Sequence, residues 1–253
     1  MIHLSISLSS QPGCVRDHNE DMLLVCTETY RDTETIREID IDDTDAVVFA
    51  VADGLGGHNA GEVASADATN ELGSHVAALP RVLTPQELRE NMEQWLQDEH
   101  AYFIEQGIAN PEQQGMGTTL VGVLCYRNAF YAFNCGDSRL YHFHDGTLTQ
   151  LSRDHSLYAL THRDSDQHRI TNCIGAGPEA YMDFANINSL IHDGDILLLC
   201  SDGLTDMLDD AMLEFMLSND ATASDLVQAA YDAGGKDNVS VIIAKITKYV
   251  INQ

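Results

Sequence analysis

Three acidic signatures each lie where an apolar run gives way to a turn: Asp53-Gly54, Asp202-Gly203 and Asp237-Asn238. The first two follow the runs 46–52 and 196–200, which have the length and apolar content of buried strands. A carboxylate at the end of a buried strand is held rigidly. Oxygen ligands fixed in this way suit Mg²⁺ or Mn²⁺, whereas zinc favours histidine and cysteine. Because we find no such residues at zinc-ligand spacings, we expect a site for hard ions only.

Asp-Gly pairs are also common in hairpin turns, so the context of each pair matters. Asp145-Gly146 lies between the strand-like runs 140–143 and 147–149, which predicts an ordinary turn. Asp53-Gly54 is different, because the glycine-rich segment 55–61 follows it and enters a predicted helix. Glycines there let backbone groups approach an ion or a phosphate closely.

The elements that must position these residues are mostly strands. Those at 119–151 follow one another through short turns, which predicts an antiparallel meander. Runs of β-branched and apolar residues predict strands at about 2–9, 22–26, 46–52, 119–126, 129–134, 139–144, 147–151, 183–190, 195–201 and 239–246.

Helices are expected in two pairs. An apolar stripe begins after Gly61, and a second helix begins at Thr84 with a first-turn proline and the capping-box residue Glu87. Amphipathic patterns predict two more helices at about 206–217 and 223–233. This order predicts an α+β fold in which two packed antiparallel sheets are flanked by helices, an α-β-β-α sandwich.

Segment 28–45 is unusually charged, with eight acids and two arginines. We expect it to form a solvated loop or hairpin between two strands.

Composition narrows the class of protein. No Pro/Ser/Gly-rich linker or repeat divides the 253 residues, so we expect one domain over residues 1–253. A net charge of −27 argues against nucleic acid as a partner and is attributed to solubility or a salty interior.

The six cysteines form no C-x-x-C pair and are expected to be buried thiols. With no basic leader and no long apolar stretch, we expect a soluble, cytoplasmic monomer without a membrane partner.

Seven short motifs occur along the chain: RDHNED (16–21), VADGLGGH (51–58), GTT (117–119), CGDSR (135–139), DHS (154–156), SDGL (201–204) and KDN (236–238). Any one motif would be weak evidence for a family, but seven in one order, covering about residues 8–247, argue against coincidence. In these motifs the chain resembles the metal-dependent Ser/Thr protein phosphatases of the PP2C type, in their compact bacterial form.

The resemblance implies a set of metal ligands. Asp53 would bridge two ions, and the Gly54 carbonyl would add a ligand to one of them. Asp202 and Asp237 would complete the other site. Asp137, with Asp202, matches a third and weaker site found in bacterial members. The implied cofactors are therefore Mn²⁺ or Mg²⁺, as two ions with a third at the weaker site.

Further roles follow from the same resemblance. Glu20, Asp21 and Asn238 would surround the ligands without binding the ions directly, and Glu20 and Asp21 would hold metal-bound water. Arg16 has a planar fork that suits a bidentate grip on the substrate phosphate. Taken in isolation, Arg16 would instead form a surface ion pair with Asp17 or Glu20.

The chain departs from the family in two places. Animal-type members have a histidine after the Asp-Gly pair as the proposed general acid, but here Leu55 stands there and cannot donate a proton. Metal-bound water or His58 is left as the donor, although helix packing is a competing role for His58. The segment at about 157–173 is short for the expected flap beside the site. It carries basic side chains that either meet a phosphoprotein or are simply solvated: His162, Arg163, His168 and Arg169.

These observations predict hydrolysis of phosphoserine and phosphothreonine in proteins, in bacterial signalling, opposed to a Ser/Thr kinase. Two cations would activate a water and neutralise the phosphoryl oxygens in a reaction that is extremely slow without help. Two alternatives stay open. One is a small phosphate-ester hydrolase, and the other is a catalytically silent phosphoprotein-binding regulator.

Overall fold

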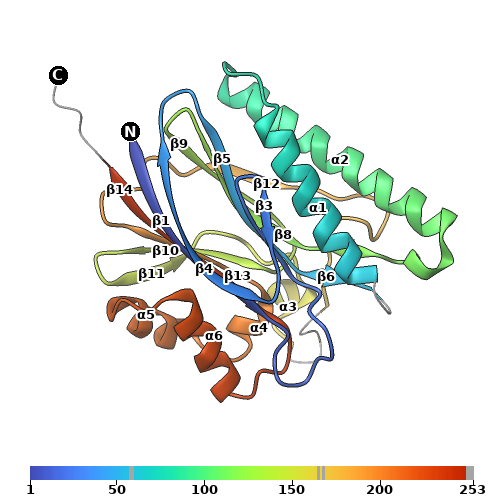
Figure 1. Cartoon of the computed structure of the whole chain (residues 1–253). Coiled ribbons are helices and arrows are strands. Elements are labelled where there is room, and N and C mark those ends of the chain that lie inside the picture. The colour runs from blue at the N-terminus through green and yellow to red at the C-terminus, as the bar shows by residue number, and fades with distance from the viewer. Residues whose placement is uncertain (57–59, 164–165, 167–168, 249–253) are drawn as a thin grey trace.

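The structure is a computed structural model, and it describes residues 1–56, 60–163, 166 and 169–248. Two six-stranded sheets, antiparallel throughout, pack face to face, as expected for the predicted sandwich (Figure 1). The first sheet has the order β11-β10-β13-β14-β1-β4. Its strands are β1 (Ile2–Gln11), β4 (Thr33–Ile41), β10 (Arg139–His144), β11 (Thr147–Gln150), β13 (Ile196–Cys200) and β14 (Val239–Lys248).

The second sheet has the order β12-β9-β8-β5-β2-β3, and a small two-stranded sheet, β6-β7, lies at its end. Its predicted meander is present as β8 and β9, whereas β10 crosses into the first sheet. The strands are β2 (Met22–Val25), β3 (Glu28–Tyr30), β5 (Ala46–Ala52), β8 (Leu120–Tyr126), β9 (Ala129–Cys135) and β12 (Asp183–Asn186), with β6 (Gly54–Leu55) and β7 (Gly117–Thr118).

Helices cover the two outer faces. The α1 (Ala60–Ala77) and α2 (Pro85–Ala109) helices pack on the second sheet, and α4 (Asp202–Thr205), α5 (Asp210–Ser218) and α6 (Ala223–Asp232) pack on the first (Figure 1). A third apolar layer lies between the sheets. Two short helices, η1 (Pro111–Gln113) and α3 (Leu157–Thr161), occur in connecting segments. Among the described residues, no helix combines the length and apolar content needed to cross a membrane.

Local signals were reliable where side chains cap or turn the backbone. Thr84 caps α2 in the expected capping box with Glu87. Asp145 and Gly146 have φ angles of 47° and 76° and connect β10 to β11 as an ordinary hairpin turn. The helix expected at 206–217 is present as α5 but begins later, at Asp210, because the Asp209 side chain accepts a hydrogen bond from the Met212 N–H (2.9 Å) and caps its first turn. The short helix α4 ends before it, at Thr205.

The expectation of a loop or paired hairpin at 28–45 was wrong. Here β3 and β4 are edge strands of different sheets, and β4 pairs with β1 from Ser10↔Thr33 to Ile2↔Ile41. Ile41 is buried and Ile39 packs against the core, while acidic side chains on the exposed side give this edge the charge that discourages pairing with another chain. The alternating pattern of a strand was hard to recognise in this segment because its charged residues outnumber the apolar residues that face inward.

The strand expected at 183–190 was also too long. It ends at Asn186, after which Ile187 and Ile191 enter the core between the sheets from a turn. A hydrogen bond from the Leu190 N–H to the Ile187 carbonyl (2.9 Å) closes that turn.

The α2 helix buries an acid against α1. Glu99 is 7% exposed, and its Oε1 has no hydrogen-bond partner among the described residues. Burial first, and the charges of Glu71 and Asp67 second, raise the pKa of Glu99 to about 7. The folded chain thus binds more protons than the unfolded chain between the ordinary value of 4.5 and about 7, so stability falls as pH rises through this window.

We therefore expect Glu99→Gln to raise the free energy of unfolding at pH 8 by on the order of 1 kcal/mol, with little effect at pH 5. Urea denaturation at the two pH values measures the difference. The exposed Glu105, on the same helix, supplies the control Glu105→Gln, which should show no such pH dependence. An equal effect of Glu99→Gln at both pH values would contradict the assignment.

Candidate metal centre

The register of the two sheets gathers the predicted acids at one end of the sandwich. Antiparallel pairing places the end of β5 beside the start of β2 (Ala52↔Met22) and the end of β13 beside the starts of β10 and β14. Each acid stands one or two residues beyond such a strand end. In this way the fold brings together Asp21, Asp53, Asp137, Asp202 and Asp237.

A cavity of about 720 Å³ opens at this end. It is lined by four of the five aspartates, with Arg16 and Lys236 as its only cationic residues among those described. The lining residues are Arg16, Glu20, Asp53, Gly54, Leu55, Gly56, Asp137, Ile170, Asp202, Gly203, Thr205, Asp206, Met207, Lys236, Asp237 and Asn238. The expected ligand set and the expected phosphate-binding arginine therefore share one cavity.

Asp53 is held by its backbone. Its N–H donates to Thr119 Oγ1 (3.1 Å), and its carbonyl accepts from the Thr118 hydroxyl and the Thr119 N–H (2.9 Å each). Thr119 Oγ1 lies 2.7 Å from Ser138 Oγ, which links this anchor to the neighbour of Asp137. The side chain of Asp53 thus projects into the cavity from a fixed base.

The charge around Asp53 is strongly negative. Burial, followed by the charges of Asp21, Asp202, Asp137 and Asp237 in that order, raises the pKa of Asp53 well above the usual range of an aspartate. Such a cluster is unfavourable unless protons or cations neutralise it.

Gly54 has no room for a side chain. A Cβ at this position would lie 2.1 Å from the Gly61 carbonyl oxygen and 2.6 Å from that of Glu20. At Gly61, a Cβ would meet Glu20 Oε1 at 2.8 Å. The two glycines therefore let β6, the start of α1 and the loop that carries Glu20 converge at the cavity wall.

Two acids keep an unpartnered carboxylate oxygen. Asp137 Oδ1 and Asp21 Oδ1 are buried and have no hydrogen-bond partner among the described residues. Burial raises the pKa of each to about 7, with a further contribution from the Asp202 charge. Ser201 Oγ donates to the other oxygen of Asp21 (2.7 Å) and so fixes that carboxylate behind the strand ends.

The chemistry of this donor set fits a divalent ion with a preference for oxygen. The cavity lining offers carboxylates and a cramped glycine backbone, and no histidine or cysteine among the described residues. Orphaned carboxylate oxygens and raised pKa values are what a hard cation would relieve. Mg²⁺ and Mn²⁺ suit this set better than zinc does.

Arg16 makes a different ion pair from the one considered for it in isolation. Its Nε and Nη2 donate to Asp237 Oδ1 (2.8 Å) and Oδ2 (2.6 Å), rather than to Asp17 or Glu20. The pair is bidentate, and the Arg16 side chain is 53% exposed. The guanidinium group thus lines the cavity, as expected, but it is hydrogen-bonded to Asp237, one of the candidate ligands.

Asn238 fastens the Arg16 loop to the first sheet. Its Nδ2 donates to the carbonyls of Pro12 and His18 (2.9 Å each), and its Oδ1 accepts from the Glu20 N–H (2.8 Å). Its side chain thus holds the loop that carries Arg16 and Glu20.

Two site residues were missed from sequence. Asp206 lines the cavity four residues after Asp202, a helical spacing that could have indicated a shared face. Arg31 was assigned to solvated charge, yet it is mostly buried, donates to the Asp21 carbonyl (2.9 Å) and pairs with Glu62 on α1 (2.9 Å). No local pattern indicated the role of Arg31, because its partners are distant in sequence.

The expected flap is only partly described. It contains α3, and the Leu157 N–H donates to the Arg169 carbonyl (2.7 Å). His155 is buried at its base, accepting from the Gly136 N–H (3.1 Å) and contacting Asp183 (3.1 Å), so its role is structural. His58 and His168 lie outside the described residues.

The structure is thus an α-β-β-α sandwich with a carboxylate-lined cavity at the shared end of its two sheets. The family described as Protein phosphatase 2C matches residues 35–236, and the chain belongs to this family.

Relatives agree with this assignment over most of the chain. Protein phosphatase PhpP of Streptococcus pneumoniae is 34% identical over 218 residues, covering 79% of this chain and 86% of PhpP. The solved serine/threonine phosphatase of S. agalactiae has a TM-score of 0.82 at 26% identity, covering 97% of this chain and 100% of that structure. The catalytic domain of PstP, solved with two manganese ions, has a TM-score of 0.76 at 28% identity, covering 98% of this chain and 100% of that domain.

The Asn238 contacts generate a test of how the site is positioned. We expect Asn238→Ala to lower kcat/KM by about 10- to 100-fold, because the loop that carries Arg16 and Glu20 loses its attachment to the start of β14. Steady-state kinetics measures this loss. Asn238→Asp keeps the acceptor for the Glu20 N–H but loses both hydrogen bonds that Nδ2 donates. Its kcat/KM should therefore fall between the values of the wild type and Asn238→Ala. Full activity of Asn238→Ala would show that the loop is held without Asn238.

Proposed function

We propose that this chain hydrolyses phosphoserine and phosphothreonine in proteins and thereby opposes a Ser/Thr kinase. One observation carries the proposal: Asp53, Asp137, Asp202 and Asp237 line a single cavity together with Arg16. Family membership supports the same reaction class. The acids suit binding of cations, and the arginine suits binding of a phosphate monoester.

We assign Asp53, Asp202 and Asp237, with the Gly54 carbonyl, to the binding of two Mn²⁺ or Mg²⁺ ions. Asp137 and Asp202 are assigned to a third ion. When bound, such ions lower the pKa of water and neutralise charge on the phosphoryl oxygens. The solved relative with two manganese ions supports this number for the main site.

Arg16 is assigned to orientation of the substrate phosphate. Its fork already matches a carboxylate in bidentate geometry, and a phosphate offers the same pair of oxygens. Lys236 is a second cationic residue in the cavity lining and adds attraction for the dianion.

The leaving alcohol must gain a proton. Leu55 lines the cavity and cannot donate one, and no histidine among the described residues lines it. We infer that water or His58, which lies outside the described residues, delivers this proton to the seryl or threonyl oxygen.

The proposal also includes the cellular compartment, the oligomeric state and the partners of the protein. All six cysteines are free thiols, and four of them are buried, which supports a reducing compartment such as the cytoplasm. We propose a single-domain monomer with a phosphoprotein substrate and neither a nucleic-acid nor a membrane partner.

The activity test follows phosphate release from a phosphothreonine peptide and from p-nitrophenyl phosphate, with Mn²⁺, Mg²⁺ or EDTA. We expect turnover of the peptide that needs metal and falls by orders of magnitude in Asp237→Asn. Asp220→Asn, at an exposed position, is the control and should retain activity. Turnover of the small ester alone would favour the small-ester alternative. No turnover by the folded protein would favour the silent regulator.

A second test addresses Arg16. We expect Arg16→Ala to raise KM more than it lowers kcat, because a guanidinium already held in bidentate geometry contributes mainly to ground-state binding of phosphate. Arg16→Lys keeps the charge without the fork and should recover only part of the loss. An unchanged KM with a reduced kcat would instead place the interaction in the transition state.

A further inference from the structure

A second cluster of potential ligands lies at the other end of the strands that deliver Asp137 and Asp202. The register of β10 and β13 runs from Arg139↔Cys200 to Phe143↔Ile196. Asp137 and Asp202 lie beyond the first pair, whereas His144 and Asp195 lie beyond the last. The two ends of one strand pair therefore carry two different sets of side chains.

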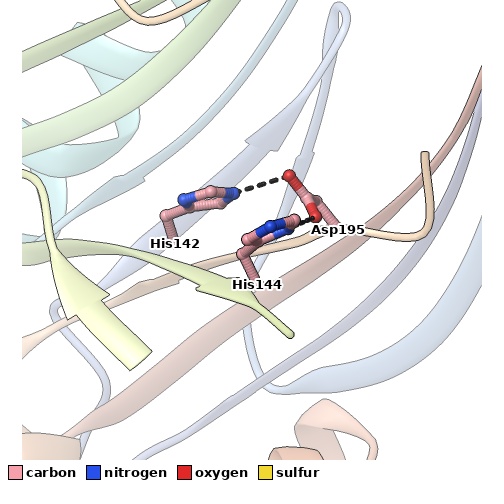
Figure 2. A group of neighbouring side chains, drawn as sticks. All are labelled: His142, His144 and Asp195. Carbon is pink, nitrogen blue, oxygen red and sulfur yellow. Dashed lines mark hydrogen bonds and ion pairs between the residues drawn. The ribbon is translucent and has the colours of Figure 1, made fainter. Parts of the chain in front are cut away.

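The second set is two histidines and an aspartate (Figure 2). His142 Nε2 lies 2.7 Å from Asp195 Oδ2, and His144 Nδ1 lies 2.6 Å from Asp195 Oδ1. The histidines are two residues apart on β10 and so share one face of the strand. Their rings stack at a centroid distance of 5.8 Å and an interplanar angle of 13°, with both presenting a nitrogen to the carboxylate.

The carboxylate is fixed from behind. Asp195 is 3% exposed, and its Oδ2 also accepts from the His192 N–H (2.7 Å). Its own carbonyl accepts from the Ile246 N–H (2.9 Å), which joins it to β14. Hydrogen bonds to a ligating carboxylate are the outer support that metal sites use. The His192 ring adds a third imidazole, with its Nδ1 3.6 Å from Asp195 Oδ2.

We propose that His142, His144 and Asp195 form a binding site for a divalent transition-metal ion, with zinc as the best match. One ligand atom from each residue can be chosen so that all three lie within 4.8 Å of one another. Two imidazoles and a carboxylate are typical zinc ligands and poor ligands for Mg²⁺. This reverses the expectation of hard ions only, because a His-x-His pair on a strand becomes a site only when a distant aspartate joins it.

The site can accept an ion with small movements. Tetrahedral zinc has bonds to nitrogen and oxygen of about 2.0–2.2 Å, so its ligand atoms lie about 3.3 Å apart. The nitrogen–oxygen pairs at 2.6 and 2.7 Å must therefore separate by less than 1 Å, and ligand atoms as far apart as 4.8 Å must approach by about 1.5 Å. The His144 side chain is 48% exposed, which leaves room for rotation and a path for entry.

The test is calorimetric titration of Zn²⁺ into the full chain with excess Mg²⁺ present to occupy the carboxylate cavity. We expect the wild type to bind one more equivalent of zinc than His144→Ala, or to bind that equivalent about tenfold or more tightly. The cavity and the exposed thiol of Cys14 are common to both proteins, so their contributions cancel.

The matched control is His3→Ala. His3 pairs with Glu38 and Asp40 (2.9 Å each) on the surface of β1 and so represents a histidine with carboxylates. This variant should keep the extra equivalent. Equal zinc binding by wild type and His144→Ala would overturn the proposal and leave the cluster as ion pairs only.

A second measurement does not depend on any variant. With Mg²⁺ in excess, Co²⁺ should give the visible absorption of a tetrahedral site, and Zn²⁺ should shift the ring ¹⁵N resonances of His142 and His144. Phosphatase activity with Mn²⁺ should be unchanged in His144→Ala, because His144 lies at the end of β10 remote from the cavity. Unshifted ring resonances at saturating zinc would exclude the site even if His144→Ala failed to fold.

Discussion

Repulsion between buried carboxylates is the constraint on which the rest of the structure depends. Asp21, Asp53, Asp137, Asp202 and Asp237 are concentrated where burial disfavours charge, and the raised pKa values of the first three record that conflict. Flexible loops would let these groups separate. They stay together because each follows or precedes a strand with an apolar layer on each of its two faces. Packing in these layers fixes the register of the strands and opposes the repulsion.

The connections around the acids show how closely the backbone is packed to achieve this. Gly54 and Gly61 permit contacts that any side chain would block, and Gly203 would place a Cβ 1.9 Å from the Asn238 carbonyl oxygen. Asn238 and Arg31 then fasten the loop before β2 to β14 on one side and to α1 on the other. The glycines in the family motifs thus allow the backbone segments around the cavity to approach closely, while the acids of the same motifs line it.

Most of the fold, and the acids that gather at the cavity, could be predicted from the sequence for a physical reason, whereas their role as metal ligands stays a prediction. Buried strands leave apolar runs, capping residues leave local spacings, and the acids stand directly at strand ends, so Asp53 and Asp202 were visible without any contact information. Failures occurred where a role depends on a distant partner. The charged edge strand β4 is defined by β1, Arg31 by Asp21 and Glu62, and the Arg16 pair by Asp237, which lies 221 positions away.

The pairing of β1 with β14 has a consequence for how the chain acquires its shape. Ten residues of β14 pair with β1 and five of these also pair with β13, so β13 and β1 are not joined until β14 is in place. Such long-range pairing carries a large loop-closure entropy and slows folding. Asp237 and Asn238 stand directly before β14, so their positions are fixed only when that strand has paired. Before β14 pairs, β13 and β1 lack the strand that joins them, and the excess of acidic side chains favours the solubility of the unfinished sheet.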